Sequence, residues 1–341
     1  MSKYYKFYAC CKIVRGAGRT TVYDLQRCSF FHFPNMIMEV LLEYETKGLE
    51  ALCRDYNTQK QELHKYLQYL LNNEIIFYTD DIDNYPDISL DIDKPFYLDF
   101  ISIEVDTLQN FKIDFLEKSI DYTGVEHIVF IFNTNRNSIN NITQLLKAIN
   151  TSRLKVVTLI LPYNEMLIEG LNELKRYNER LKQIILYNKS DAISISKLTD
   201  YNAEIFNGSL HKLLTKKIKS EKDFTLNIMS FLEAQNKNLF FNRRVYISDD
   251  GNVKPSFVDN NYYGTIEYDS LFDIVNKKGF QRIWNITKDQ IEVCKNCEFR
   301  YMCPDNRIPI KNNNKYIHTT ECNYNPFTTQ WKSNVSESIV E

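Results

Sequence analysis

The chain has 341 residues, of which 43% are hydrophobic and 25% charged, and its formal net charge is −2. This composition is typical of a globular protein, and the length predicts two or three domains. The net charge gives no sign of a nucleic-acid partner. No window approaches the roughly 20 apolar residues of a membrane span, and the apolar stretch at residues 7–11 is too short for a signal peptide. We therefore expect a cytoplasmic protein, with no membrane partner, in which eight cysteines serve a purpose other than disulfide formation.

Residues 1–85 are predicted to form a small α+β module. The glycine-bearing turn at residues 15–18 joins two expected strands, and two helical patterns follow before a returning strand. A hairpin, helices and a closing strand together indicate a winged-helix-like module. The predicted elements are strands over 4–14 and 19–25, helices over 35–44 and 59–73, and a strand over 75–78.

A linker rich in aspartate at residues 80–95 leads to a second region, over residues 93–222, where strands alternate with helices. Strands of nearly continuous apolar character between amphipathic helices predict βαβ units and a parallel sheet. Four strands would form half a (β/α) barrel or a small doubly wound sheet, and residues 190–222 are expected to be a polar connection. The predicted strands are 96–105, 127–132, 154–161 and 183–187, and the predicted helices are 111–122, 139–149 and 165–177.

The third region, residues 223–341, opens with a predicted hairpin around residues 249–251 and contains the clearest chemical signal. Four of the eight cysteines cluster there, and the first two are separated by two residues, so one turn can present both sulfurs to one ion. Four thiolates satisfy either tetrahedral zinc or a four-iron cluster. His318 could replace one of the cysteines as a ligand. The candidate ligands are Cys294, Cys297, Cys303 and Cys322.

The residues around these cysteines resemble a known family. Residues 291–303 read Ile-Glu-Val-Cys-x2-Cys-Glu-Phe-Arg-Tyr-x-Cys, and residues 322–331 read Cys-x-Tyr-Asn-Pro-x4-Trp. These segments resemble the SPASM domain, in the form found in "grasp-with-spasm" systems that mature ribosomally made peptides (graspetide-type systems). Residues 7–11 and 22–27 are similar to that subfamily as well. The resemblance implies a SPASM-type domain whose four cysteines bind an auxiliary 4Fe-4S cluster, with structural zinc as the alternative.

The chain also departs from the radical-SAM/SPASM pattern. Radical-SAM enzymes hold their catalytic cluster with a CxxxCxxC motif after the first barrel strand, yet residues 96–110 contain no cysteine. Ser256 and Asn306 stand where further cluster cysteines are expected. The middle region therefore resembles a degenerate radical-SAM-like partial (β/α) barrel, and no S-adenosylmethionine is expected to bind.

The resemblance implies a role in maturing a ribosomally made, post-translationally modified peptide beside an ATP-grasp ligase. Because the radical-initiating motif is missing, a metal-containing subunit that recognises or scaffolds the precursor peptide is favoured, and whether it is an enzyme is open. Strand 19–25 with helix 59–73 would form the groove for the precursor, unless the module only packs on its neighbours. The alternatives are a divergent SPASM enzyme with its own activity and a zinc-bearing winged-helix regulator.

Overall fold

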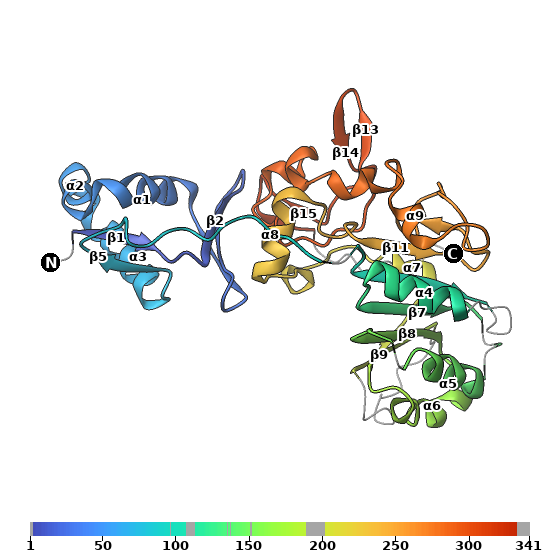
Figure 1. Ribbon diagram of the computed structural model, residues 1–341. Helices are drawn as coiled ribbons and strands as arrows, with labels where there is room; N and C mark the ends of the chain where they lie inside the picture. Colours follow the sequence, from blue (N-terminus) through green and yellow to red (C-terminus); the bar gives the residue numbers. More distant parts are fainter. Residues whose placement is uncertain are drawn as a thin grey trace.

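The chain folds into a mixed α/β protein with small sheets near its N-terminus and a central, mostly parallel sheet (Figure 1). The α/β class predicted above is confirmed at this level. None of the helices in the described part of the chain has the length and apolar character needed to cross a membrane. The computed structural model describes residues 3–95, 97–106, 113–134, 136, 138–150, 152–188 and 202–332.

The N-terminal unit contains two small sheets and three helices. Strand β1 pairs with β5, while β2, β3 and β4 form a separate antiparallel sheet. Helix α3 buries Leu63, Leu67 and Leu70, which the spacing i, i+4, i+7 places on one face. The elements are β1 (Tyr4–Phe7), β2 (Cys11–Arg15), β3 (Thr20–Asp24), β4 (Ser29–Phe33), α1 (Asn35–Lys47), α2 (Leu49–Asp55), η1 (Asn57–Gln59), α3 (Lys60–Asn72) and β5 (Ile76–Thr79).

Two predictions for this unit were wrong. The expected strand 4–14 is two strands, because a turn closed by a bond from Cys11 N to Tyr8 O (2.8 Å) sends its halves into different sheets. Residues 29–33 and 49–55, for which no element was predicted, form β4 and α2. As a result, the strand expected to border the peptide groove, β3, is the central strand of its sheet, with β2 on one side and β4 on the other.

The central sheet has the order β10-β9-β8-β7-β6-β11-β12, and all its strands except β12 run parallel. All four strands predicted here are present. From β6 to β10 each strand neighbours the next one along the chain, whereas the strand order of a doubly wound sheet reverses. The elements are β6 (Phe100–Val105), α4 (Ile113–Thr123), β7 (His127–Phe132), α5 (Ile139–Ala148), β8 (Val156–Pro162), α6 (Glu165–Leu171), η3 (Leu174–Arg176), β9 (Leu181–Tyr187) and β10 (Asn202–Phe206).

Three strands of this sheet lie outside the four that were predicted for it. Strand β10 lies in the predicted polar connection, whose residues 190–201 are outside the described part of the chain. Strand β11 (Arg244–Ile247) belongs to the predicted hairpin with β12 (Val253–Lys254), and it also pairs in parallel with β6. Sequence periodicity identifies such a strand but not its partner, so the extension of the sheet was missed.

The two faces of the sheet are covered differently. Helices α4 and α5 pack one face, burying Leu116, Ile120 and Leu145 against the strands. The opposite face carries a smaller apolar cluster that includes Tyr187 and Tyr246, and helix α7 (Leu210–Leu214) contributes to it.

His127, on β7, makes the stability of this sheet sensitive to acid. Its ring packs 4.4 Å from that of Phe100, and its Nε2 lies 3.0 Å from Thr158 Oγ1. Burial, followed by the charge of Arg244, lowers the pKa of His127 to about 4. An unfolded histidine titrates near pH 6.5, so the unfolded state binds more protons between these values and stability falls as pH falls through this window.

We expect His127→Gln to flatten this pH dependence, which can reach on the order of 3 kcal/mol below pH 4. Urea denaturation at several pH values between 4 and 7 measures it. His64→Gln, at an exposed position on α3, is the matched control and should keep the wild-type slope. An unchanged slope in His127→Gln would contradict the assignment.

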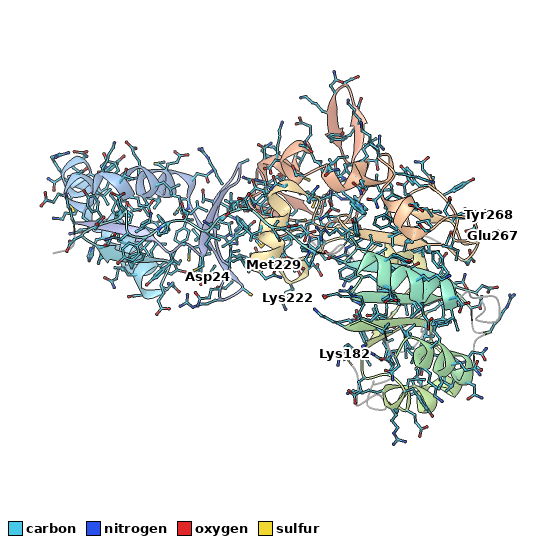
Figure 2. The ribbon with its side chains drawn as sticks, viewed as in Figure 1. Asp24, Lys182, Lys222, Met229, Glu267 and Tyr268 are labelled. Atoms are coloured by element: carbon cyan, nitrogen blue, oxygen red, sulfur yellow. The ribbon has the colours of Figure 1, made fainter. Side chains whose placement is uncertain are left out.

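The C-terminal unit consists of short elements held together by an apolar cluster shared with the N-terminal sheet. Tyr23 of β3 packs there against Phe231 of α8 and Phe299. Asp24 and Met229 lie on the two sides of this junction (Figure 2). The elements are η4 (Glu221–Asp223), α8 (Ile228–Asn236), α9 (Leu271–Val275), η5 (Phe280–Asn285), η6 (Lys288–Gln290), η7 (Cys294–Asn296), β13 (Ile310–Asn312), β14 (Lys315–Ile317), β15 (Tyr324–Asn325) and β16 (Gln330–Trp331).

Candidate metal centre

The four candidate cysteines lie on two segments of the C-terminal unit. Cys294 begins η7, Cys297 follows that turn directly, and Cys303 ends the next turn. Cys322 comes two residues before β15. All four are free thiols of intermediate exposure, and Cys297 and Cys322 border the apolar cluster shared with the N-terminal sheet.

The thiols are close enough to influence one another's ionisation. Burial raises the pKa of Cys303, and the charges of Asp305, Cys294 and Cys322 raise it further. Burial also raises the pKa of Cys297, followed by the charges of Glu298 and Cys303. Among the causes of these two shifts, Cys303 is linked to Cys294, Cys297 and Cys322. Because a bound metal ion needs thiolates, its binding must release protons and will be favoured at higher pH.

A buried group of charges lies beside the cysteines, and its cations favour the thiolate form whereas its carboxylate opposes that form. Lys288 Nζ lies 2.8 Å from Asp305 Oδ2, both side chains are about 5% exposed, and Arg307 binds the same carboxylate at 2.8 Å. Lys288 and Arg307 share the single carboxylate of Asp305, so this group keeps a net positive charge. Lys288 opposes the rise in the pKa of both Cys294 and Cys303. Although burial works against it, the charge of Lys288 holds the pKa of Asp305 well below its usual range.

The spacing of the donors bears on which metal fits. Four thiolates on one zinc ion sit close together, whereas a four-iron cube holds them further apart on separate irons. In the described part of the chain, no three of the four sulfurs lie within 4.8 Å of one another. A tighter group does exist there, in which Cys294, Asp305 and His318 each bring one ligand atom within that distance. Such a group, with one thiol, one carboxylate and one imidazole, is suited to a single ion.

A second group of potential ligands, Cys10, Cys11 and Asp24, lies in the N-terminal sheet. Cys11 begins β2 and is buried, whereas Cys10 lies in the turn before β2 and is half-buried. Asp24 Oδ2 already pairs with Arg27 Nη1 at 2.9 Å, so Cys10 and Cys11 have no free carboxylate beside them.

The tip of the β2–β3 hairpin, residues 15–19, is inserted between the two cysteine-bearing segments. Ala17 N donates to Asn296 O (2.8 Å) and Gly18 N to Pro326 O (3.0 Å). A Cβ on Gly16 would lie 2.8 Å from Glu298 N, so only glycine allows this approach. The sequence marked these glycines as a turn, but their second role depends on contacts with residues about 280 positions away.

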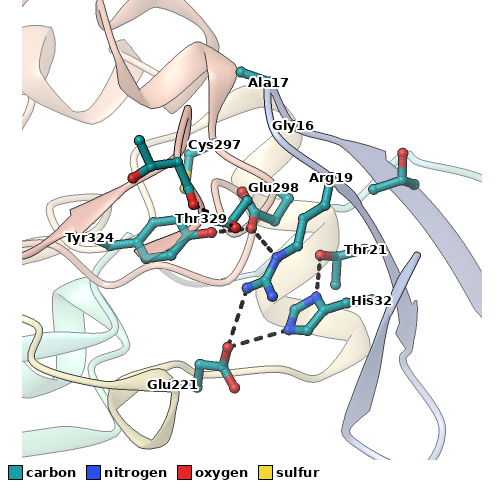
Figure 3. Close-up of polar contacts among 12 residues, drawn as sticks. Gly16, Ala17, Arg19, Thr21, His32, Glu221, Cys297, Glu298, Tyr324 and Thr329 are labelled. Carbon is teal, nitrogen blue, oxygen red and sulfur yellow. Dashed lines mark hydrogen bonds and ion pairs between the residues drawn. The ribbon is translucent and has the colours of Figure 1, made fainter. Parts of the chain in front are cut away.

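Glu298, directly after Cys297, is the charged centre of this contact (Figure 3). Its side chain is 0% exposed, and Oε1 accepts hydrogen bonds from Arg19 Nε (2.6 Å) and from the hydroxyl of Tyr324. Its backbone oxygen accepts a bond from Tyr23 OH at 2.5 Å. The carboxylate therefore joins the hairpin tip, the first cysteine segment and the segment after Cys322.

The same network extends to the outer strand of the N-terminal sheet. Arg19 Nη2 lies 3.4 Å from Glu221 Oε1, and His32 Nε2 lies 3.3 Å from the same oxygen (Figure 3). The other ring nitrogen of His32, Nδ1, lies 2.9 Å from Thr21 Oγ1. Arg19, Glu298 and Glu221 were not identified from the sequence, because no local pattern links them.

Comparison with known proteins gives a distant structural likeness only. The chain matches no family model and no curated protein. Among solved structures it is similar to Streptococcus suis SuiB bound to S-adenosylmethionine and to SuiB bound to the precursor peptide SuiA. Each shares 10% sequence identity, covers 88% of this chain and 94% of SuiB, and has a TM-score of 0.33 and 0.34, respectively.

Proposed function

We propose that this protein is a metal-containing subunit that recognises an extended precursor peptide for modification by a partner enzyme. The observation that carries the proposal is a groove between an open strand edge and helix α3 in the N-terminal unit. The sequence resemblance supports the wider setting, in which residues 1–85 bind the peptide, residues 93–222 form a degenerate partial (β/α) barrel, and residues 223–341 form a SPASM-type domain.

Strand β4 provides the edge. In the described part of the chain β4 pairs only with β3, so the backbone groups on its other side are available to another strand. A cavity of about 640 Å³ lies between β4 and α3. An extended peptide binds such an edge by continuing the sheet, while pockets beside the strand select its side chains.

Aromatic side chains make this groove suited to an apolar anchor on the peptide. Tyr69 of α3 is 47% exposed, and its ring centroid lies 5.9 Å from that of Phe33 and 6.4 Å from that of Phe31. Glu62 and Lys65 line the same cavity with opposite charges. We therefore propose a peptide with an apolar residue flanked by polar ones, and not a polyanion.

We expect Tyr69→Ala to weaken binding of a labelled precursor peptide by about tenfold or more, because exposed tyrosines in grooves carry much of the binding energy. Fluorescence anisotropy measures the affinity. Tyr122→Ala, on α4 and also strongly exposed, is the matched control and should bind normally. Equal affinity for a peptide with a scrambled leader would remove the proposal.

The proposed C-terminal metal site would hold a 4Fe-4S cluster through Cys294, Cys297, Cys303 and Cys322, with zinc as the alternative. A cluster so placed would anchor the unit and could carry an electron, whereas zinc would only anchor it. The visible spectrum of anaerobically purified protein separates them, because iron–sulfur thiolates absorb broadly and zinc leaves the protein colourless. An ATP-grasp ligase is the proposed partner enzyme, and co-purification with the ligase and precursor tests that association.

A further inference from the structure

His318 follows β14 and its side chain lies inside the C-terminal unit, although the three residues after it are exposed. Its side chain is 5% exposed, and neither ring nitrogen has a hydrogen-bond partner of normal geometry in the described part of the chain. Burial has removed both nitrogens from water, so the groups packed around the ring decide what it can bind.

The surroundings of His318 are those of a metal ligand. One of its nitrogens, Cys294 Sγ and an oxygen of Asp305 all lie within 4.8 Å of one another. We propose that His318 and Cys294 bind the same divalent ion, and that zinc, which accepts thiolate and imidazole together, is the ion this pair favours. This inference rests on the zinc alternative of the proposed function, and it adds His318 to the ligands of that site.

Asp305 acts in this arrangement as the group that orients the imidazole. Its two oxygens already accept hydrogen bonds from Lys288 (2.8 Å) and from the Arg307 side chain (2.8 and 2.9 Å). These bonds make the carboxylate a weak candidate for a direct ligand of the ion. His318 Nε2 lies 3.2 Å from Asp305 Oδ2. A carboxylate behind a histidine ligand fixes the ring and raises its basicity.

An open cavity connects the proposed ion site with solvent, and it contains a further possible ligand. Cys294 and His318 line one open cavity of about 500 Å³, and Cys322 lines it too. An ion can therefore reach the pair from solvent, and Cys322 can supply a second thiolate. Binding would remove a proton from each thiol that joins the ion and release it to solvent.

Cobalt(II) titration of the reduced, metal-free full-length chain tests the proposal, because cobalt replaces zinc and reports its ligands by colour. We expect His318→Ala to weaken cobalt and zinc binding at least tenfold and to change the ligand-field spectrum. His318→Cys should keep tight binding and add thiolate-to-cobalt charge-transfer absorption. Asp305→Asn should retain the ligand-field spectrum but bind about 10- to 100-fold more weakly, as loss of an outer carboxylate does.

The matched control is His211→Ala, an exposed histidine on α7, which should titrate like the wild type. Unchanged affinity and spectrum in His318→Ala would overturn the proposal. If that variant does not fold, His318→Cys decides, since the absence of added charge-transfer absorption there would also overturn it. No peptide is used, so this result and the peptide-binding result can fail independently.

Discussion

We expect Cys297→Ser to release the proposed metal from the C-terminal unit and to lower the melting temperature of that unit sharply. Cys297 borders the apolar cluster that joins this unit to the N-terminal sheet, and the unit itself is made of short elements. Structural metal sites contribute on the order of 10 kcal/mol to folding at pH 7, so the loss of one ligand affects the whole unit. Metal content per chain and thermal unfolding are the measurements.

Cys53→Ser provides the comparison, because Cys53 is an exposed thiol on α2, remote in sequence from the four candidates. It should keep the wild-type metal content and melting temperature. If Cys297→Ser also kept both, the proposed site would be refuted. Metal loss with a normal melting temperature would show that the ion is bound there but is not needed for folding.

Arg19→Ala is expected to cost about 3–5 kcal/mol of unfolding free energy, because it leaves the fully buried carboxylate of Glu298 without its cation. It should also speed metal release to a chelator, since the hairpin tip holds the segments on both sides of the site. Denaturant titration and the rate of metal transfer to a coloured chelator measure the two effects.

The double variant Arg19→Ala/Glu298→Gln separates charge from packing. Glutamine has nearly the volume of glutamate but no charge, so the second change should restore part of the lost stability. Arg15→Ala is the control: its side chain is 66% exposed and pairs with Glu39 at the surface, so it should cost about 1 kcal/mol at most. A double variant as unstable as Arg19→Ala would argue that the lost contacts of Arg19, and not the buried charge, dominate.

The sequence predicted the elements that periodicity defines and missed those that depend on distant partners. Strand β7 was predicted at its observed bounds and α3 to within a residue, because apolar residues recur regularly along both. Strand β4 was missed even though its sequence, Ser-Phe-Phe-His-Phe, is rich in strand-forming aromatics. The pairing of β11 with β6 joins residues more than 140 positions apart, which no local pattern encodes.

The candidate site shows the same division. The cysteine spacing is a local signal, and it drew attention to the C-terminal unit. Arg19 and Glu298 form an ion pair across 279 positions of the sequence, and the residues around each of them give no sign of the other. His318 entered only as a possible substitute for a cysteine, because a lone histidine in sequence does not reveal that its ring is buried beside Cys294. Tertiary structure alone supplies that observation.

The place of β11 has a consequence for synthesis on the ribosome. Strand β6 lies between β7 and β11, so one of its edges stays open until residues 244–247 have been translated and can dock. An open edge of this kind can pair with other nascent chains. The central sheet therefore completes its hydrogen bonding only after the C-terminal unit has begun to emerge, and chains interrupted before that point should be clients of chaperones.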